Sequence, residues 1–193
     1  MQELSLDILD IVQNSVRANA ALIELSVTVD EPADLLTVYV KDDGCGMSAS
    51  QLAKVTDPFW TTRTTRKGNI GLGIPLFKMG AELTGGSLTV TSDDSADSHG
   101  TELTATFGLR SIDRPPLGDI CDTVHMLVTL NTRIDFVYTY RVVSGGDARG
   151  FTLDTREFKE TLGGVPLDTP DVAQYIAEYL TENTLESNAG RSY

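Results

Sequence analysis

The sequence predicts an α+β fold in which a mixed sheet carries helices on one face, followed by a small C-terminal α/β domain. Apolar residues first recur at helical spacing and then alternate with a period of two. The elements follow the order helix, two strands, helix, loop, helix, two strands, which is typical of a two-layer sandwich. A proline-containing linker at residues 111–119 then separates an expected first domain, residues 1–110, from an expected second domain, residues 120–185.

The first expected elements are a helix and a hairpin. Residues 3–19 read as a helix because apolar residues recur at helical spacing from Leu4 to Val12 and nothing in the segment breaks it. From Ile23 the apolar period changes to two, as in a half-buried strand. A second strand, LLTVYV, follows the polar turn at residues 31–34, so the two strands are expected to form a hairpin.

A glycine-rich turn, DDGCGM, leads from this hairpin to a short helix, for which Ser48 is the expected N-cap. A long polar loop then runs from residue 57 to about residue 71. In the helix that follows, Pro75 suits the first turn and Gly85 suits the C-terminal stop. Two further strands, SLTVTS and TELTATFGL, flank a polar loop and complete the first domain.

The pattern restarts after the paired prolines of DRPPLGD, which enforce an extended backbone. Residues 118–130 are expected to be helical, and RIDFVYTYRVV and GFTLD to be strands joined by a Ser-Gly-Gly-Asp turn. The last helix is expected to start at Pro170, with Thr169 as its cap and one apolar face. The tail at residues 186–193 is expected to be disordered.

Composition narrows the classes of function. The formal net charge of -13 repels nucleic-acid phosphates and anionic lipids, so non-specific nucleic-acid binding is not expected. No apolar run is long enough to cross a bilayer and the start MQELSLDILD lacks the features of a signal peptide, so the sequence predicts a soluble cytoplasmic protein. Cys45 and Cys121 are spaced for neither a disulfide framework nor a zinc site, and both thiols are expected to be free.

Polar residues with ligand-binding chemistry occur at three places. Asp10, Asn14 and Arg17 share one face of the first helix, where they could polarise a water, hold a metal and meet a phosphate, although a solvated helix face has the same pattern. In DDGCGM, Asp42 can accept a hydrogen bond from an exocyclic amine, although an ordinary glycine turn also explains this segment. The loop DPFWTTRTTRKGNIGLG ends at a helix N-terminus, where backbone N–H groups favour phosphate.

Four motifs occur in one order: ILDIVQNSVRANA, VKDDGCGM, DPFWTTR with GNIGLG, and GTE. Read together, they resemble the N, G1, F with G2, and G3 boxes of the ATPase superfamily that contains histidine kinases, gyrase, Hsp90 and MutL, the GHKL superfamily. The resemblance covers residues 1–110. It implies the α/β sandwich called the Bergerat fold, with ATP and Mg²⁺ as ligands.

The resemblance also implies roles for single residues. Asn14 would ligate Mg²⁺, Asp42 would recognise the adenine amine, and Thr101 would support Asp42 through a water. Gly44 and Gly46 would shape the adenine pocket. The other residues expected to contact the nucleotide are Arg17, Met47, Phe59, Thr62, Arg63, Lys67, Gly71, Leu72 and Gly73.

Two details point to different branches of the superfamily. Asp10 stands four residues before Asn14, where MutL and gyrase have the Glu that activates water, so the resemblance implies a general base. Arg17 and the compact lid look instead like histidine kinases and their anti-sigma-factor serine-kinase relatives. No helical hairpin with a phosphoacceptor histidine precedes the ATP domain, so autophosphorylation of the usual sort is not expected, and His125 is interpreted as a packed or surface histidine.

These features lead to a stand-alone Mg-ATP-binding protein that serves as a regulatory kinase or a nucleotide-dependent switch. Its expected partner is another protein, engaged by the C-terminal domain. The alternative is a MutL-like slow ATP hydrolase in which lid closure is coupled to dimerisation, which would make the chain a homodimer. A non-catalytic nucleotide-sensing adaptor is the third hypothesis.

Overall fold

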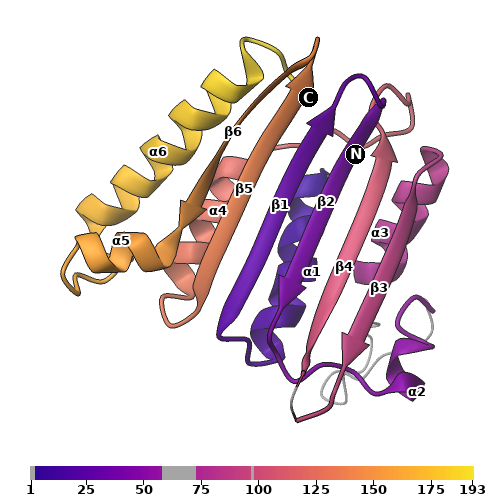
Figure 1. Cartoon of the computed structure of the whole chain (residues 1–193), viewed down its shortest axis with the longest axis horizontal. Coiled ribbons are helices and arrows are strands. Elements are labelled where there is room, and N and C mark those ends of the chain that lie inside the picture. Colours follow the sequence, from indigo (N-terminus) through magenta and orange to yellow (C-terminus); the bar gives the residue numbers. More distant parts are fainter. Residues whose placement is uncertain (1–2, 58–72, 97) are drawn as a thin grey trace.

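The computed structural model describes residues 3–57, 73–96 and 98–193 of the chain (Figure 1). Its strands are β1 (Leu22–Asp30), β2 (Leu35–Asp42), β3 (Ser87–Asp93), β4 (Gly100–Gly108), β5 (Asp135–Ser144) and β6 (Asp147–Asp154). Its helices are α1 (Leu4–Arg17), α2 (Ala49–Leu52), α3 (Gly73–Leu83), α4 (Ile120–Leu130), α5 (Thr155–Thr161) and α6 (Pro170–Asn188). All elements predicted in the described ranges are present, and α5 is an addition.

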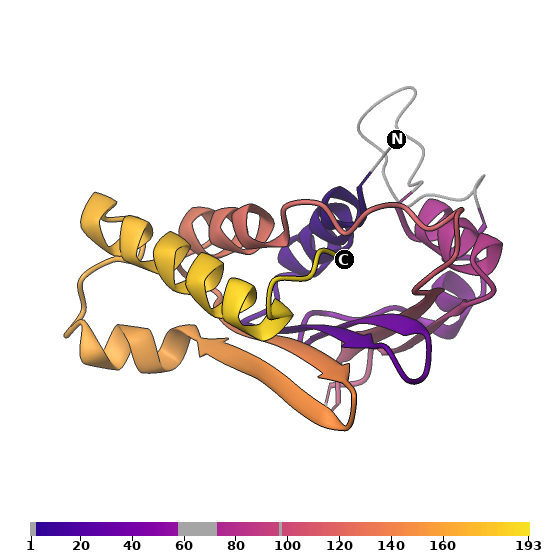
Figure 2. The same cartoon turned by 90° about the horizontal axis from the view of Figure 1, so that it is seen from above.

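The described strands form a single mixed sheet in the order β3-β4-β2-β1-β5-β6. Neighbouring strands are antiparallel except β1 and β5, which run parallel. Figure 2 shows α1, α3, α4 and α6 on the same side of this sheet. The predicted class, an α+β fold with helices on one face of a mixed sheet, is therefore confirmed.

The core lies between the sheet and this helical layer. Every second residue of β1 and β2 is buried, as the alternating sequence pattern predicts. On α1 the buried side chains include Leu4, Ile8 and Val12, and the helix contacts both α3 and α4. Because α1 is held between two other helices and the sheet, the backbone that carries the polar residues of its remaining face has a fixed position.

The C-terminal part differs from the separate small domain that the sequence predicts. β5 pairs with β1 along its full length, from Leu22 opposite Asp135 to Asp30 opposite Val143, so one sheet runs through both parts. Buried residues of both parts belong to one apolar cluster. A two-stranded hairpin is marginal in water, and β1 would otherwise present an unpaired edge, so joining the sheets stabilises both.

The segment predicted as a linker, residues 111–119, packs against the start of α1. The backbone N–H groups of Leu4 and Ser5 donate to the carbonyls of Pro116 and Leu117, each at 2.9 Å. The first N–H groups of a helix have no partner within the helix, and Glu3 provides no side-chain cap here. This segment therefore caps α1 in addition to connecting β4 to α4.

The C-terminal tail also differs from the sequence prediction of disorder at residues 186–193. α6 continues to Asn188, and beyond it the Arg191 guanidinium donates to Ser144 Oγ at 2.7 Å. The Tyr193 hydroxyl donates to Glu31 Oε1 at 2.9 Å, and hydrogen bonds from Ser144 and Tyr193 lower the pKa of Glu31. The tail is held by polar contacts with distant residues, which a local sequence pattern does not reveal.

Within the described ranges, no helix combines the length and apolarity needed to cross a bilayer.

Candidate functional site

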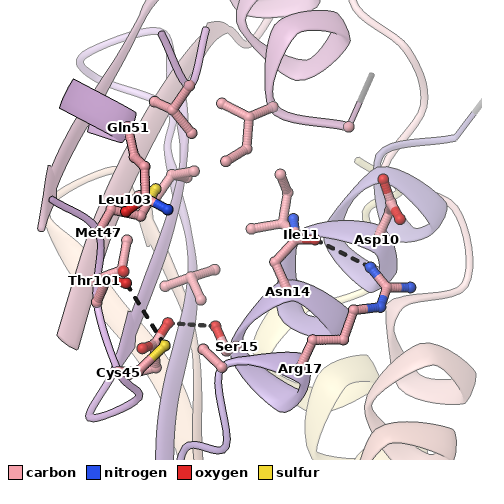
Figure 3. Close-up of a pocket in the computed structure, with 17 residues that line it drawn as sticks. Asp10, Ile11, Asn14, Ser15, Arg17, Cys45, Met47, Gln51, Thr101 and Leu103 are labelled. Carbon is pink, nitrogen blue, oxygen red and sulfur yellow. Dashed lines mark hydrogen bonds between the residues drawn. The ribbon is translucent and has the colours of Figure 1, made fainter. Parts of the chain in front are cut away.

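A cleft of about 330 Å³ opens between the polar face of α1 and the β2–β4 side of the sheet. This volume is at the lower end of small-molecule sites, roughly 300–1,000 Å³. Figure 3 shows Asp10, Asn14 and Arg17 on one side of it, and Met47, Thr101 and Leu103 on the other. The lining residues are Asp10, Ile11, Asn14, Ser15, Arg17, Ala18, Val40, Asp42, Cys45, Gly46, Met47, Gln51, Val55, Gly73, Ile74, Thr101 and Leu103.

One end of the cleft is built around Asp42, the last residue of β2. This carboxylate is only 8% exposed, and each of its oxygens has a donor. Ser15 Oγ of α1 donates to Oδ2 at 2.5 Å, and the backbone N–H of Gly44 donates to Oδ1 at 3.0 Å. A buried carboxylate needs such donors. Their arrangement also fixes its direction and leaves it able to accept a hydrogen bond from an amine in the cleft.

The loop that follows Asp42, residues 43–47, is anchored to two other parts of the chain. The N–H of Cys45 donates to the carbonyl of Ala18, just beyond the end of α1, at 2.9 Å. Nδ1 of His99, which precedes β4, lies 2.9 Å from the carbonyl oxygen of Gly44. The wall of the cleft at this end is therefore held in place by a backbone hydrogen bond and by a contact with the His99 side chain.

The two glycines of this loop leave no room for a side chain. A Cβ on Gly44 would lie 2.7 Å from Cβ of Ala18. Gly46 has φ +67°, and a Cβ there would lie 1.7 Å from the carbonyl oxygen of Asp93. Positive φ and contact with another backbone both require glycine at position 46.

Thr101 lies beside Asp42 because the two residues face each other in the β2–β4 register. Its hydroxyl is 2.9 Å from Ser92 Oγ of β3, and Ser92 Oγ accepts a hydrogen bond from the Met47 N–H at 2.8 Å. These contacts link the loop to β3 and, through Ser92, to β4. Thr101 is thus close to Asp42 in the fold, as the resemblance implies, and its water-mediated role stays a prediction.

The other end of the cleft is more exposed and is formed by α1 and the start of α3. Asn14 Oδ1 accepts a hydrogen bond from Arg17 Nη1 at 3.1 Å, and Arg17 is exposed to solvent. Gly73, the first residue of α3, approaches Asp10 so closely that a Cβ would lie 2.1 Å from its Oδ2. An amide, a guanidinium, a carboxylate and a helix N-terminus therefore meet at this end.

The chemistry of the cleft fits Mg-ATP. Ile11, Val40 and Leu103 are buried apolar residues of the lining and can contact a flat ring, while the polar groups lie at the two ends. No group of three or more His, Cys, Asp or Glu residues in the described ranges could hold a metal alone. Asn14 offers an amide oxygen to the cleft, and a site with few protein oxygens suits Mg²⁺ because this ion keeps waters and substrate phosphates as its other ligands.

The structure brings together the sequence-predicted site residues that it describes. Gly44 is not part of the lining but lies close to Ala18 and Asp42, which are. The other described residues of the predicted site all line the cleft: Asp10, Asn14, Arg17, Asp42, Gly46, Met47, Gly73 and Thr101. The predicted residues Phe59, Thr62, Arg63, Lys67, Gly71 and Leu72 lie outside the described ranges. The cleft is also lined by residues that were not predicted, among them Ile11, Ser15 and Ala18 from α1 and its C-cap. Their spacing of four and three places them on one face of the helix, but only the position of the sheet shows that this face meets the cleft.

Fold and cleft together define a class of protein: an α+β sandwich with a small-molecule site between its first helix and its sheet. Residues 3–111 match the family described as histidine kinase-, DNA gyrase B- and HSP90-like ATPases. The match covers more than half of the chain, and the protein belongs to this family. Membership implies ATP binding.

Known proteins are similar to about half of the chain. The chain is 31% identical to the heme sensor protein HssS of Staphylococcus saprophyticus over 98 residues. This match covers 51% of the chain and 20% of HssS. The chain is 33% identical to the sensor histidine kinase WalK of Bacillus subtilis over 88 residues. This match covers 44% of the chain and 14% of WalK. The chain thus matches only a small part of each relative.

A solved structure is similar over a longer stretch. The N-terminal domain of a DNA repair protein superposes on 80% of the chain and 53% of its own length, with a TM-score of 0.53 and 16% identity. This likeness shows the fold alone. Because it covers more of the chain than residues 3–111, it is in keeping with a sheet that continues past the family match.

Proposed function

We propose that the chain binds Mg-ATP in this cleft and acts on a protein partner, as a regulatory kinase or as a nucleotide-dependent switch. The observation that best supports ATP as the ligand is Asp42, a buried carboxylate held by Ser15 and Gly44 at one end of the cleft. Asn14 and Arg17 offer an amide oxygen and a guanidinium at the other end. This separation suits a ligand with an amine-bearing base and a polyphosphate.

Each residue contributes one kind of contact. Asp42 accepts a hydrogen bond from the amine of the base, which selects adenine over a base with a carbonyl at that position. Asn14 supplies one oxygen to Mg²⁺, and the bound ion offsets phosphate charge. Arg17 and the N-terminus of α3 donate to phosphate oxygens. The similar segments of HssS and WalK, a sensor protein and a sensor histidine kinase by name, favour the kinase class.

A second function, slow ATP hydrolysis, is favoured by the position of Asp10. Its carboxylate lies against Gly73 at the start of α3, in the same cleft as Asn14. A carboxylate beside a helix N-terminus that binds phosphate is suited to take a proton from an attacking water. Asp10 is the general base in this alternative, while a kinase would transfer the phosphoryl group to its partner instead.

Incubation of the purified chain with γ-labelled ATP, alone and with lysate, separates these functions. Label on protein supports a kinase, free phosphate supports a hydrolase, and neither product supports a non-catalytic adaptor. We expect Asn14→Ala to lower the affinity for Mg-ATP by roughly tenfold or more, because the amide oxygen proposed to bind the metal is lost. Unchanged affinity in this variant would count against the site, and normal hydrolysis by Asp10→Asn would count against the general base.

The cellular setting belongs to the same proposal. Cys45 and Cys121 are both free thiols, which suits the reducing cytoplasm. The C-terminal part shares a sheet with the nucleotide site and offers a surface for the partner through α6 and β6. A homodimer stays a prediction tied to the hydrolase alternative, and size-exclusion chromatography with and without nucleotide tests it.

A further inference from the structure

The oxygen expected to bind Mg²⁺ already has a cationic partner in this structure. Asn14 Oδ1 accepts a hydrogen bond from Nη1 of Arg17, three residues later on α1, at 3.1 Å (Figure 3). Both residues line the cleft. The contact is local to one helix face, so it forms without any change in the sheet or the core.

A guanidinium and a magnesium ion cannot both occupy this oxygen at low cost. Mg²⁺ binds oxygen at roughly 2.1 Å. A second cation within hydrogen-bonding distance of the same atom would repel it strongly, since like charges this close interact even near a protein surface. Occupation of Asn14 by metal therefore requires that Arg17 leave.

Arg17 has a better partner only when phosphate is present. Its contact with Asn14 is a hydrogen bond to a neutral amide, whereas a bond from guanidinium to a phosphate oxygen joins opposite charges and can be bidentate. In the described ranges Arg17 forms no ion pair that would compete with such a move. Arrival of the polyphosphate therefore frees the Asn14 oxygen.

We propose that Arg17 occupies the Asn14 oxygen when no nucleotide is bound and so blocks Mg²⁺ from it. Binding of Mg²⁺ at Asn14 then depends on prior or simultaneous binding of the nucleotide. This inference rests on the proposed function, because it assigns Arg17 two partners, Asn14 without nucleotide and a phosphate oxygen with it. Arg17 is thus a positioning residue for the metal site in addition to a phosphate ligand. The hydrogen bond from Arg17 to Asn14 therefore links binding of the metal to binding of the nucleotide.

The measurable quantity is the dissociation constant for Mg²⁺ without nucleotide, the state in which Arg17 contacts the Asn14 oxygen. Calorimetric titration of Mg²⁺ into four chains gives it: the native chain, Arg17→Gln, Asn14→Ala and the double variant. We expect Arg17→Gln to lower this constant by roughly fivefold or more, because the metal no longer has to displace the guanidinium. We also expect Arg17→Gln to weaken binding of ATP in EDTA, because a phosphate contact is lost.

The Asn14→Ala background separates competition at the Asn14 oxygen from a general effect of the positive charge of Arg17. If Arg17 acts through this oxygen, Arg17→Gln leaves the dissociation constant for Mg²⁺ unchanged in that background. An equal fall of the constant in both backgrounds would overturn the inference, because removal of the charge alone would then explain it. An unchanged constant in Arg17→Gln would overturn it as well.

A second measurement avoids substitutions. In a ¹⁵N spectrum of the native chain, the side-chain amide of Asn14 should shift on addition of ATP in EDTA, as Arg17 leaves, and should not shift with Mg²⁺ alone. A shift with Mg²⁺ alone would overturn the proposed role of Arg17 while leaving the proposed function intact. Failure of the native chain to bind ATP in either condition would overturn the proposed function and this inference with it.

Discussion

The two ends of the cleft are built differently. At the end that we assign to adenine, Ser15 and Asp42 are buried, and the carboxylate has a donor on each oxygen. At the phosphate end, Arg17 is exposed and its contact with Asn14 lies within one helix. The base end is pre-organised, whereas the phosphate end has groups that can exchange partners. Recognition of the base can thus be rigid while the chemistry at the phosphates stays adjustable.

One glycine at each end shows the same difference. A Cβ on Gly46 would meet the backbone carbonyl of Asp93, which cannot move without its strand. A Cβ on Gly73 would meet the end of the Asp10 side chain, which can rotate. The same substitution by alanine therefore probes rigidity at the two ends.

The largest effect is expected for Gly46→Ala. Positive φ alone costs of order 1–3 kcal/mol, and the contact with Asp93 adds to it, so we expect a loss of about 3 kcal/mol in the free energy of unfolding. ATP binding should weaken roughly a hundredfold, since 1.4 kcal/mol corresponds to about tenfold. Thermal unfolding and calorimetry measure both quantities.

Gly85→Ala is the matched control, because Gly85 also has positive φ but nothing within 4 Å of its Cβ position. Equal losses in the two variants would contradict a rigid base end.

An intermediate effect is expected for Ser15→Ala. Removal of the hydroxyl leaves Oδ2 of Asp42 without its donor, and hydrogen bonds to charged groups contribute about 1.5–3 kcal/mol, so affinity for ATP should fall roughly tenfold. The matched probe is purine riboside triphosphate, which lacks the amine of adenine. Its affinity should change less than about twofold, because it gains little from an oriented carboxylate. An equal loss for both nucleotides would show that Ser15 only supports the fold.

The smallest effect is expected for Gly73→Ala. The Asp10 carboxylate can turn away from the new methyl group at a cost of order 0.5–1.5 kcal/mol, so affinity for ATP should fall by only about threefold. If the chain hydrolyses ATP, the rate should fall further than the affinity, because the displaced carboxylate is the proposed base. A loss of affinity as large as that of Gly46→Ala would mean that the phosphate end is as rigid as the base end.

Local patterns predicted most of the fold, because each element has a clear period or boundary signal. The alternation from Ile23 onwards identified β1 and its buried face, and Ser48 forms the expected N-cap of α2. Periodicity does not say which strands are neighbours, however. That Ile23 lies beside Phe136 depends on pairing between distant segments, so the joined sheet was not foreseen. The short helix α5 is mostly polar and shows no helical period.

The sequence also led to part of the cleft lining, while the roles of these residues stay predictions. Motif order identified Asp10, Asn14 and Asp42, and the fold brings them to one cleft. Ser15 was missed, because a serine in a helix carries no signal of its own and acquires a role only when β2 ends beside it. Lid residues such as Arg63 and Lys67 lie outside the described ranges and stay predictions.

The contacts at the start of α1 bear on where the chain can be shortened. The segment that matches the family ends at residue 111, yet Pro116 and Leu117 hold the first turn of the helix that carries Asn14. A cut at that point would remove these acceptors and would also expose the edge of β1 that β5 covers. The segment that matches the family, residues 3–111, is therefore shorter than the part of the chain that packs together as one folded unit.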